Sequence, residues 1–379
     1  MRILHIVTDL KTGGAEITLL KLLGAMDRAV FEQQVISLGG VGSIGVQIEA
    51  LGVNVYALNL NQPRYFLSAI FRLLHLVRGF RPDIIQGWMY HGNLVACIAG
   101  VLCNCKIVLW NVRQTLAGLR EEKWLTAWCI RIGAWLSQRP VGILYNSRVA
   151  SVQHAAVGYC AQKTILISNG FDVKLFCPDK TAMVDVRKEL GLIESATLVG
   201  LVARYHPMKD HDVFLVAASY LATRFHQVHF VLVGREVTLE NSILASRLTE
   251  LKLTDRVHLL GERVDTPRIT AALTVAVSCS WRGEAFSNAV GEAMASGVPC
   301  VVTDVGDSAL IVGEGGRVIA PKNPRALADS IAEILDLNEE EYQKLSELAR
   351  RRIESQFSLE RVAAEYGNLY LACQKQGVV

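Results

Sequence analysis

The chain has 379 residues, more than one ordinary compact domain holds, and this length fits two domains of about 150 to 200 residues each. No apolar run approaches the roughly 18 residues that cross a bilayer, and the first apolar run is a short strand, so we expect no signal peptide and a soluble or peripheral protein. The net charge of +3 conceals an asymmetry, because residues 1–170 carry 16 Lys and Arg against 8 Asp and Glu, and the remainder carries 23 against 28.

Nine cysteines are scattered without a CxxC pair, which favours free thiols in a reducing cytosol. Cys103 and Cys105 form the only close pair, and without further Cys or His at metal-ligand spacing we interpret them as packing residues. Strands alternate with helices throughout, and the hydrophobic content of 51% suits parallel strands buried on both faces. We therefore expect a cytoplasmic protein of the α/β class.

The amino terminus predicts a first strand, a tight loop and an amphipathic helix. Residues 2–7 read as the strand, and Gly13 and Gly14 lie in the loop, where glycine lets backbone approach a ligand closely. The G-x-G-x-x-G spacing of dinucleotide-binding folds is absent, and the second strand, predicted at residues 34–38, ends without the acid that would bind a ribose. These absences disfavour a dehydrogenase, whereas a simple turn and helix start would explain the glycines as well as a ligand site.

Polar residues follow two further predicted strands of the first half. His91 follows the strand at 83–87, just before a helix, and Asn111 and Arg113 follow the strand at 107–110. The carboxyl ends of parallel strands are where open α/β sheets bind ligands, so these side chains are candidates for a site. A single His is more often a structural residue, and that alternative stays open for His91.

Basic and aromatic residues are interleaved in two segments of the first half. One segment has Arg64, Arg72, Arg78 and Arg81 among Phe66, Phe71 and Phe80, and the other is a helix predicted over 120–139 with Trp124, Trp128 and Trp135 on one face. These elements either lie against an anionic membrane leaflet or bury their aromatic residues in the core beneath a solvated basic face. Nucleic acid is disfavoured, because no zinc-finger, RRM or basic-zipper pattern accompanies the charge.

A polar, turn-rich connector from Asn169 to Asp179 separates the two halves, and we predict the domain boundary after residue 172. Beyond it, the apolar run at 198–203 reads as a buried strand that ends in Arg204, with Lys209 shortly before a helix. Two cations at the carboxyl end of a strand are suited to a diphosphate whose charge grows as it leaves. Two ordinary loop cations would give the same pattern.

Two carboxylates, Glu284 and Glu292, bracket the predicted start of a short helix. Asn288 is a plausible N-cap, and Gly297-Val298-Pro299 is a stop signal. The backbone amides near Phe286 and Ser287 would then bind a phosphate at the positive end of the helix, while the carboxylates accept hydrogen bonds from sugar hydroxyls. A solvated helix-start acid and a second surface glutamate would be the ordinary alternative.

This segment resembles the GT4-type retaining glycosyltransferases, the group 1 glycosyltransferase family, whose signature is two glutamates eight positions apart. The run from Gly291 to Pro299, followed by Val301-Val302-Thr303-Asp304, is similar to that family word for word. One departure is Ala285, where the family usually has Gly, so the local approach to the donor is expected to differ slightly if the position needs a glycine torsion. The resemblance covers nearly the whole chain.

The resemblance implies the GT-B fold, with two Rossmann-like domains whose parallel sheets face each other across a cleft. The first domain would comprise residues 1–172 on the acceptor side, completed by a C-terminal helix at 359–374 that crosses back to it. The second, nucleotide-sugar-binding domain would comprise residues 173–358. GT-B enzymes generally use cations and a helix end in place of a divalent ion, so no metal or other cofactor is expected.

The resemblance also implies roles for single residues. Arg204 and Lys209 would bind the diphosphate, and the loop with Gly13 and Gly14 would face the donor phosphates or the acceptor. His91 would contact the donor sugar or the reacting centre. For the remaining candidates, Glu292 would hold the ribose, Glu284 would orient the donor sugar, Phe286, Ser287 and Asn288 would line the donor site, and Asn111 and Arg113 would lie on the acceptor side.

We therefore expect a hexosyltransferase that uses a nucleotide diphosphate sugar, with UDP-sugars favoured over GDP-sugars. The acceptor would be a glycan or lipid-linked glycan in bacterial cell-surface polysaccharide synthesis, at the cytoplasmic face of the membrane and with possible peripheral contact to anionic lipid. Two alternatives stay open. A nucleotide-sugar epimerase of the same architecture would convert the donor without an acceptor, and a noncatalytic nucleotide-sugar-binding protein would do neither.

Overall fold

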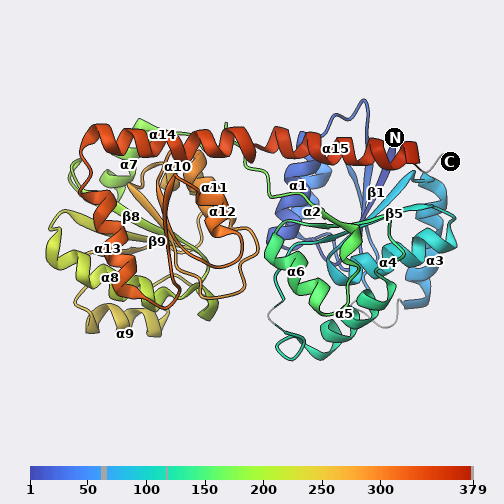
Figure 1. The fold of residues 1–379 in the computed structure, drawn as a ribbon, viewed down its shortest axis with the longest axis horizontal. Helices are drawn as coiled ribbons and strands as arrows, with labels where there is room; N and C mark the ends of the chain where they lie inside the picture. The colour runs from blue at the N-terminus through green and yellow to red at the C-terminus, as the bar shows by residue number, and fades with distance from the viewer. Residues whose placement is uncertain (61–65, 117, 377–379) are drawn as a thin grey trace. The chain divides into compact units, whose positions relative to one another are not determined.

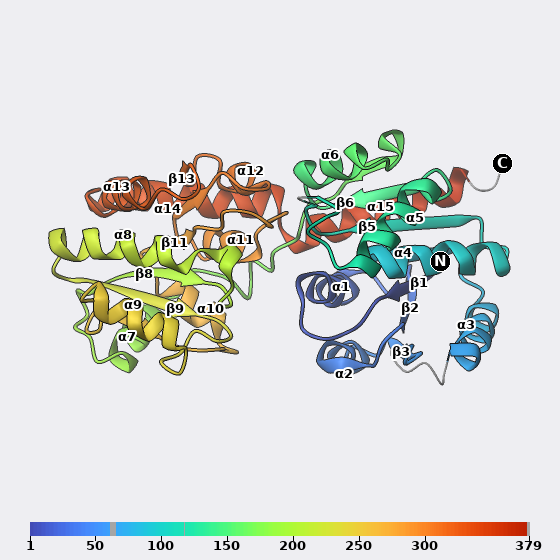
Figure 2. The same cartoon turned by 90° about the horizontal axis from the view of Figure 1, so that it is seen from below.

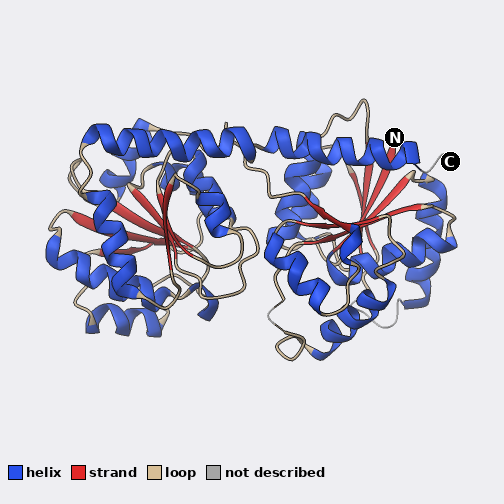
Figure 3. Ribbon diagram, viewed as in Figure 1, coloured by secondary structure: helices blue, strands red, loops and turns tan. Residues whose placement is uncertain are grey.

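The computed structural model describes residues 1–60, 66–116 and 118–376, and it divides the chain into two compact units (Figure 1). The N-terminal unit comprises Met1–Gly170 together with the segment from Leu359 onwards, and the C-terminal unit comprises Phe171–Ser358. Each unit is a parallel sheet flanked by helices (Figure 3). The predicted α/β class with two parallel-sheet domains is thereby confirmed. Of the residues singled out above, Arg64 lies outside the described residues.

The N-terminal unit contains a seven-stranded sheet of order β3-β2-β1-β4-β5-β6-β7, in which all pairs are parallel. The central strands are buried along their whole length, as expected for a sheet covered on both faces. In sheet order the strands are Asn54–Ala57, Glu32–Ser37, Arg2–Val7, Ile84–Trp88, Ile107–Val112, Gly142–Tyr145 and Thr164–Leu166.

Helices cover both faces of this sheet, and α3 and α4 lie on the side away from α1 and α2 (Figure 2). One core cluster joins the sheet to α1 (Gly14–Ala25), α2 (Gly42–Ala50) and α15 (Leu359–Gln376). The other joins it to α3 (Phe66–Phe80), α4 (Met89–Leu102), α5 (Trp124–Leu136) and α6 (Arg148–Ala156). A short 3-10 turn, η2 (Ala161–Lys163), precedes β7.

The C-terminal unit contains a six-stranded parallel sheet of order β10-β9-β8-β11-β12-β13. Its strands in that order are Val257–Leu259, Val228–Val233, Thr197–Val202, Val275–Ser278, Cys300–Thr303 and Gly316–Ile319. The helices α7 to α14 are Lys180–Glu189, His211–Arg224, Ser242–Glu250, Thr266–Ala271, Asn288–Ala295, Ser308–Val312, Pro324–Leu335 and Glu339–Gln356, and the 3-10 turn η3 is Pro207–Lys209. Because the strands run parallel, the carboxyl ends of β8, β11 and β12 meet at one edge of the sheet.

The chain enters and leaves the C-terminal unit side by side. The Phe171 N–H donates to the Phe357 carbonyl at 2.8 Å, and a parallel bridge joins Phe171 to Ser358. The unit therefore begins at Phe171, two residues before the boundary predicted from the connector, because the packing of Phe171 rather than the turn-rich sequence fixes where the second core starts.

Two candidate residues of the N-terminal unit lie in different elements from those predicted. The strand β5 continues through Asn111 to Val112, so Asn111 is a buried strand residue and not part of the following loop. His91 lies in the first turn of α4 rather than before a helix, because Met89 turns directly out of the strand with a positive φ of 60°.

Candidate active site

The strand β8 ends in a turn that presents two cations at the carboxyl edge of the C-terminal sheet. Arg204 is exposed, and Lys209 ends the short turn η3 just before α8 begins. Asp210, with a φ of 53°, adopts the left-handed conformation that redirects the backbone from η3 into α8. The predicted arrangement of strand, cationic turn and helix is therefore present.

The Lys209 ammonium group forms an ion pair with the Glu284 carboxylate, which follows β11 in the sequence. The Ser280 hydroxyl donates a hydrogen bond to the same Glu284 oxygen at 3.1 Å. The Glu284 side chain is 12% exposed and that of Lys209 is 28% exposed, so the carboxylate is held in one position near the surface. Such a fixed carboxylate is suited to accepting hydrogen bonds from the hydroxyls of a bound sugar.

Glycines set the backbone around Glu284. Gly306 has a φ of 62°, and a Cβ there would lie 2.2 Å from the Glu284 carbonyl oxygen. The Asp307 N–H donates to the Ala285 carbonyl at 2.9 Å, which fixes the two loops together. Ala285 itself is buried and has a negative φ, whereas Gly283 has a φ of 78°. The expected conflict at Ala285 is therefore not found, because a neighbouring glycine adopts the left-handed torsion.

The helix α11 begins one residue earlier than predicted, since Ser287 is its N-cap and Asn288 its first residue. The Ser287 side chain makes no capping hydrogen bond, so it does not itself satisfy the N–H groups of the first turn. The Phe286 ring stacks on Phe171 at 6.1 Å and so belongs to the core. In this structure Phe286 anchors the helix start, while Glu292 lies half-buried in the second turn.

Further groups that the sequence analysis missed surround the same turn. Burial lowers the pKa of His206, and the nearby cations Arg204, Lys209 and Arg282 lower it further. The Arg282 guanidinium lies 4.3 Å from the centre of the Trp281 ring, whose Nε1 donates to the Pro207 carbonyl at 3.0 Å. Arg282 is thus a third cation at the site. The only signal for it in the sequence is its position two residues before Glu284.

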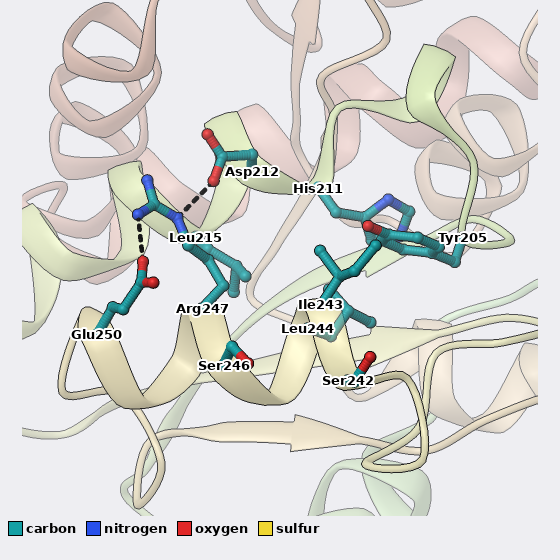
Figure 4. Close-up of a pocket in the computed structure, with 10 residues that line it drawn as sticks. All are labelled: Tyr205, His211, Asp212, Leu215, Ser242, Ile243, Leu244, Ser246, Arg247 and Glu250. Carbon is teal, nitrogen blue, oxygen red and sulfur yellow. Dashed lines mark hydrogen bonds and ion pairs between the residues drawn. The ribbon is translucent and has the colours of Figure 1, made fainter.

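Two acids follow the cationic turn with the spacing Asp-x-Asp, but each is paired with a different cation. Lys322 forms an ion pair with Asp210 at 2.8 Å, and Arg247 forms one with Asp212 at 2.6 Å. Arg247 also pairs with Glu250 at 2.8 Å, in a pocket of about 370 Å³ between α8 and α9 (Figure 4). Because Asp212 and Glu250 both neutralise Arg247, this pocket is a poor site for a phosphate.

In the N-terminal unit, Gly13 is the N-cap of α1, in extended backbone, and Gly14 is the first residue of the helix. A Cβ at Gly13 would lie 2.3 Å from a carboxylate oxygen of Glu16, whereas a Cβ at Gly14 would meet nothing within 4 Å. Burial raises the pKa of Glu16, and the charge of Asp9 adds to the effect. The space beside Gly13 is therefore occupied by the side chain of Glu16.

His91 is half-buried at the start of α4, and burial lowers the pKa of its imidazole, which favours the neutral form. Gly92 brings this helix start against β1, because a Cβ there would lie 2.5 Å from the Ile6 carbonyl oxygen. The close packing of helix on strand thus fixes His91 at the carboxyl edge of the N-terminal sheet.

Asn111 and Arg113 lie in a buried hydrogen-bond network with the C-terminal helix. The Tyr366 hydroxyl of α15 accepts from Asn111 Nδ2 at 2.9 Å and from Arg113 Nη1 at 3.0 Å. Arg113 Nη2 also donates to Asn169 Oδ1, which accepts from Asn146 Nδ2 at 3.1 Å. These two residues therefore have a structural role in joining α15 and the connector to β5, and their acceptor-side role stays a prediction.

Known proteins match this chain over both units. The family model of Glycosyltransferase Family 4 matches residues 12–175, and the family model of Glycosyl transferases group 1 matches residues 196–337. The lipopolysaccharide core biosynthesis mannosyltransferase LpsB of Rhizobium meliloti (strain 1021) is 29% identical over 314 residues, which cover 79% of this chain and 84% of that protein. The UDP-Gal:alpha-D-GlcNAc-diphosphoundecaprenol alpha-1,3-galactosyltransferase of Escherichia coli is 28% identical over 80% of this chain and 79% of that one.

Among solved structures, Anabaena Alr3699/HepE in complex with UDP has a TM-score of 0.86 at 22% identity, covering 98% of this chain and 100% of that one. This likeness concerns the fold, and the sequence matches concern the enzyme class. One family model matches a segment of the first half of the chain and the other a segment of the second half, and the described site contains cations, carboxylates and a helix start. The chain belongs to the group 1, family 4 glycosyltransferases on the GT-B fold.

Proposed function

We propose that this glycosyltransferase moves a hexosyl unit from a UDP-sugar, with retention of configuration, to a hydroxyl of a lipid-linked glycan in bacterial surface-polysaccharide synthesis. The observation that carries the proposal is that Lys209, Glu284 and the loop leading into the N-terminus of α11 lie together at one edge of the C-terminal sheet. Cations and helix-start amides suit a diphosphate, and a fixed carboxylate suits sugar hydroxyls.

In the proposed reaction the bond between the anomeric carbon and the diphosphate oxygen breaks, and a bond from the anomeric carbon to the acceptor oxygen forms. The electron pair of the broken bond stays on the diphosphate. The proton of the acceptor hydroxyl is taken up by the departing diphosphate or by solvent. Arg204 and Lys209 stabilise the growing negative charge, and Glu284 orients the hexose. Glu292 holds the ribose hydroxyls.

The N-terminal unit would supply His91 and the loop of Gly13 and Gly14. A neutral imidazole, which its lowered pKa favours, can accept a hydrogen bond from a sugar hydroxyl or donate one to a sugar oxygen. Gly14 is the more suitable of the two glycines for approach to a ligand, since nothing lies within 4 Å of the position of a Cβ there. We expect the first unit to determine acceptor choice.

One relative and one solved structure support the choice of donor and acceptor. The galactosyltransferase from Escherichia coli is named for a UDP-Gal donor and a diphosphoundecaprenol-linked acceptor, and the Anabaena structure holds UDP. The relative from Rhizobium meliloti is named as a mannosyltransferase of lipopolysaccharide core synthesis. Transfer of a hexose is the feature that both names state, and the UDP donor and lipid-linked acceptor are proposed from the galactosyltransferase.

The test is a panel of UDP- and GDP-sugars incubated with and without lipid-linked acceptor, in which thermal stabilisation, transfer and hydrolysis are followed together. We expect one UDP-hexose to stabilise the protein and to be consumed with acceptor, in the presence of EDTA as well as without it. Nuclear magnetic resonance of the product should show the anomeric configuration of the donor. Conversion of the donor without acceptor would instead indicate an epimerase, and binding without turnover would indicate a noncatalytic protein.

A further inference from the structure

The outer surface of three helices of the N-terminal unit is apolar and aromatic. The side chains Trp124, Trp128 and Trp135 of α5 are 70%, 55% and 79% exposed. The other tryptophans of this unit, Trp88 and Trp110, are fully buried. The exposed tryptophans therefore lie on one helix, and the interpretation that they are core residues is wrong.

Large apolar side chains are also exposed on α4 and α3. Ile98, Val101 and Leu102 on α4 are 52%, 70% and 50% exposed, and Phe71 on α3 is 73% exposed. A groove of about 540 Å³ joins the ends of α4 and α5, with Val101 and Leu102 on one side and Leu136 on the other. In Figures 1 and 2, α4 lies between α3 and α5. We call the exposed side of these helices the α3–α5 face.

The charged residues within α3, α4 and α5 are all basic. None of the three helices contains an aspartate or a glutamate, whereas the helices on the other face of the sheet carry Glu16, Glu49 and Glu360. Two glutamates, Glu121 and Glu122, precede α5. The exposed cations on and beside the three helices include Arg72, Arg78, Arg81, Lys106, Lys123, Arg131 and Arg139.

Protein surfaces that lie at the boundary between lipid and water are typically rich in tryptophan and in basic residues. A tryptophan ring places its apolar body toward acyl chains and its N–H toward the headgroups, and Lys and Arg bind anionic headgroups. The Arg131 guanidinium lies 6.0 Å from the centre of the Trp128 ring, so both kinds of group occur at one point of the face. Among the described residues, no helix is long and apolar enough to span a bilayer.

We propose that the α3–α5 face docks on the surface of a bilayer that contains anionic lipid. The tryptophans of α5 insert at headgroup depth, and the flanking cations bind the headgroups. This inference deepens the proposed function and rests on it for its purpose, because an enzyme that uses a lipid-linked acceptor meets that acceptor at a membrane. The charge of the face favours anionic lipid over a second copy of the chain, which would bring like charges together.

The test is flotation of the full chain with vesicles, in the absence of any nucleotide sugar. Vesicles of phosphatidylcholine alone are compared with vesicles that also contain phosphatidylglycerol. We expect binding to the anionic vesicles, and we expect the Trp128→Ser/Trp135→Ser double variant to lower the partition coefficient by about tenfold or more. The Arg131→Glu/Arg139→Glu variant should lower it by about tenfold on anionic vesicles only.

Matched controls come from the other face of the same unit. Val46 is 59% exposed on α2 and Arg28 is exposed after α1, so Val46→Ser and Arg28→Glu should leave vesicle binding unchanged. Absence of binding to anionic vesicles, or equal losses in the control variants, would overturn the proposal. The proposal would also be overturned if the protein did not bind vesicles but self-associated with increasing concentration, and if the tryptophan variant abolished this self-association. That result would assign the α3–α5 face to a second copy of the chain. Because the assay needs no sugar transfer, its failure is distinguishable from failure of the proposed reaction.

Discussion

Lys209 and Glu284, 75 positions apart in the sequence, form an ion pair at the carboxyl edge of the C-terminal sheet. Lys209 follows β8 and Glu284 follows β11, and these strands are neighbours in the sheet. The pair therefore follows from the sheet order, which places two loops that are distant in sequence side by side. A diphosphate that binds Lys209 would leave the Glu284 carboxylate, held by Ser280, to the sugar.

Replacement of Glu284 by alanine should lower turnover more than it weakens nucleotide binding. The expected loss of kcat is on the order of 100-fold, the cost of removing one hydrogen-bonding group that acts on the transition state. The measurement is kcat at saturating donor together with the Kd for UDP. The control is Ser280→Ala, which removes one hydrogen bond to Glu284 and should cost less. Full transfer activity in the alanine variant would rule out the role of Glu284.

Replacement of Arg204 by alanine should weaken donor binding and lower turnover together, because a diphosphate cation acts in both the ground state and the transition state. Calorimetry with UDP and steady-state kinetics measure the two effects. Arg224→Ala is the matched control, since Arg224 lies in the last turn of α8 and pairs with Asp336 at an exposed site. Equal behaviour of the two variants would contradict the assignment of Arg204.

Gly306→Ala should disrupt the site, whereas Gly191→Ala should not. Both glycines have positive φ, of 62° and 69°, but only a Cβ at Gly306 meets the Glu284 carbonyl oxygen, at 2.2 Å. Gly191→Ala should therefore cost about 1 to 2 kcal/mol from its torsion alone and keep its turnover. Gly306→Ala should lose at least about tenfold in turnover, because the Glu284 backbone must move. Urea unfolding of both variants measures the cost of the backbone torsion. Kinetics of both variants measure the loss of turnover that the contact with the Glu284 carbonyl oxygen causes.

Tyr366→Phe should destabilise the protein by about 1 to 3 kcal/mol, since it removes the buried hydroxyl that accepts hydrogen bonds from Asn111 Nδ2 and Arg113 Nη1. Urea unfolding gives the stability change, and limited proteolysis within α15 should become faster if the helix detaches from β5. Tyr220→Phe is the control, because the Tyr220 side chain is 42% exposed. No change in either measurement would show that the buried network does not hold α15.

The buried His5 should make stability fall below neutral pH. Trp88 Nε1 donates to His5 Nδ1 at 3.2 Å, so His5 Nε2 carries the proton toward Gln33 Oε1 at 3.1 Å. Burial lowers the pKa of His5 from 6.5 to about 4, so the unfolded chain binds the extra proton first as the pH falls. The free energy of unfolding should therefore decrease between about pH 6.5 and pH 4, by up to about 1.4 kcal/mol per pH unit.

Urea unfolding at about pH 5 and at neutral pH measures this dependence. His5→Gln keeps an acceptor and a donor but does not titrate, so the difference between the two pH values should shrink. The exposed His226 provides the control, His226→Gln, which should leave the difference as it is. An unchanged pH dependence in His5→Gln would assign the acid sensitivity to other groups.

Local sequence patterns predicted the elements well where apolar runs and turn residues agree. The first strand is found at its predicted bounds, Arg2–Val7, while the last helix, whose placement came from the family resemblance, begins at Leu359 as expected. The N-cap of α11 was misplaced by one residue, because Ser287 and Asn288 are both good capping residues and only the backbone torsions distinguish them. Boundaries of this kind depend on tertiary packing more than on propensity.

The helix α5 shows why hydrophobicity alone did not decide which face is buried. Its buried residues are Ala127, Ile130 and Gly133, and a Cβ at Gly133 would lie 2.4 Å from the Tyr159 hydroxyl. The tight space beside Tyr159 accepts only a glycine, and the large Trp128 and Trp135 are left outside. An apolar pattern on all sides of a helix cannot distinguish these faces, because the space available is set by residues elsewhere in the chain.

The sequence by itself determined the α/β class, the order of strands and helices, and the motif that carries Glu284 and Glu292, since these depend on short-range patterns of apolar, turn and capping residues. Only the tertiary structure decided that Lys209 pairs with Glu284, that Arg282 joins the cations, and that Asn111 and Arg113 bind Tyr366. The physical reason is that strand order and helix orientation minimise the free energy of the whole core, and this joint packing brings together side chains that no local pattern relates.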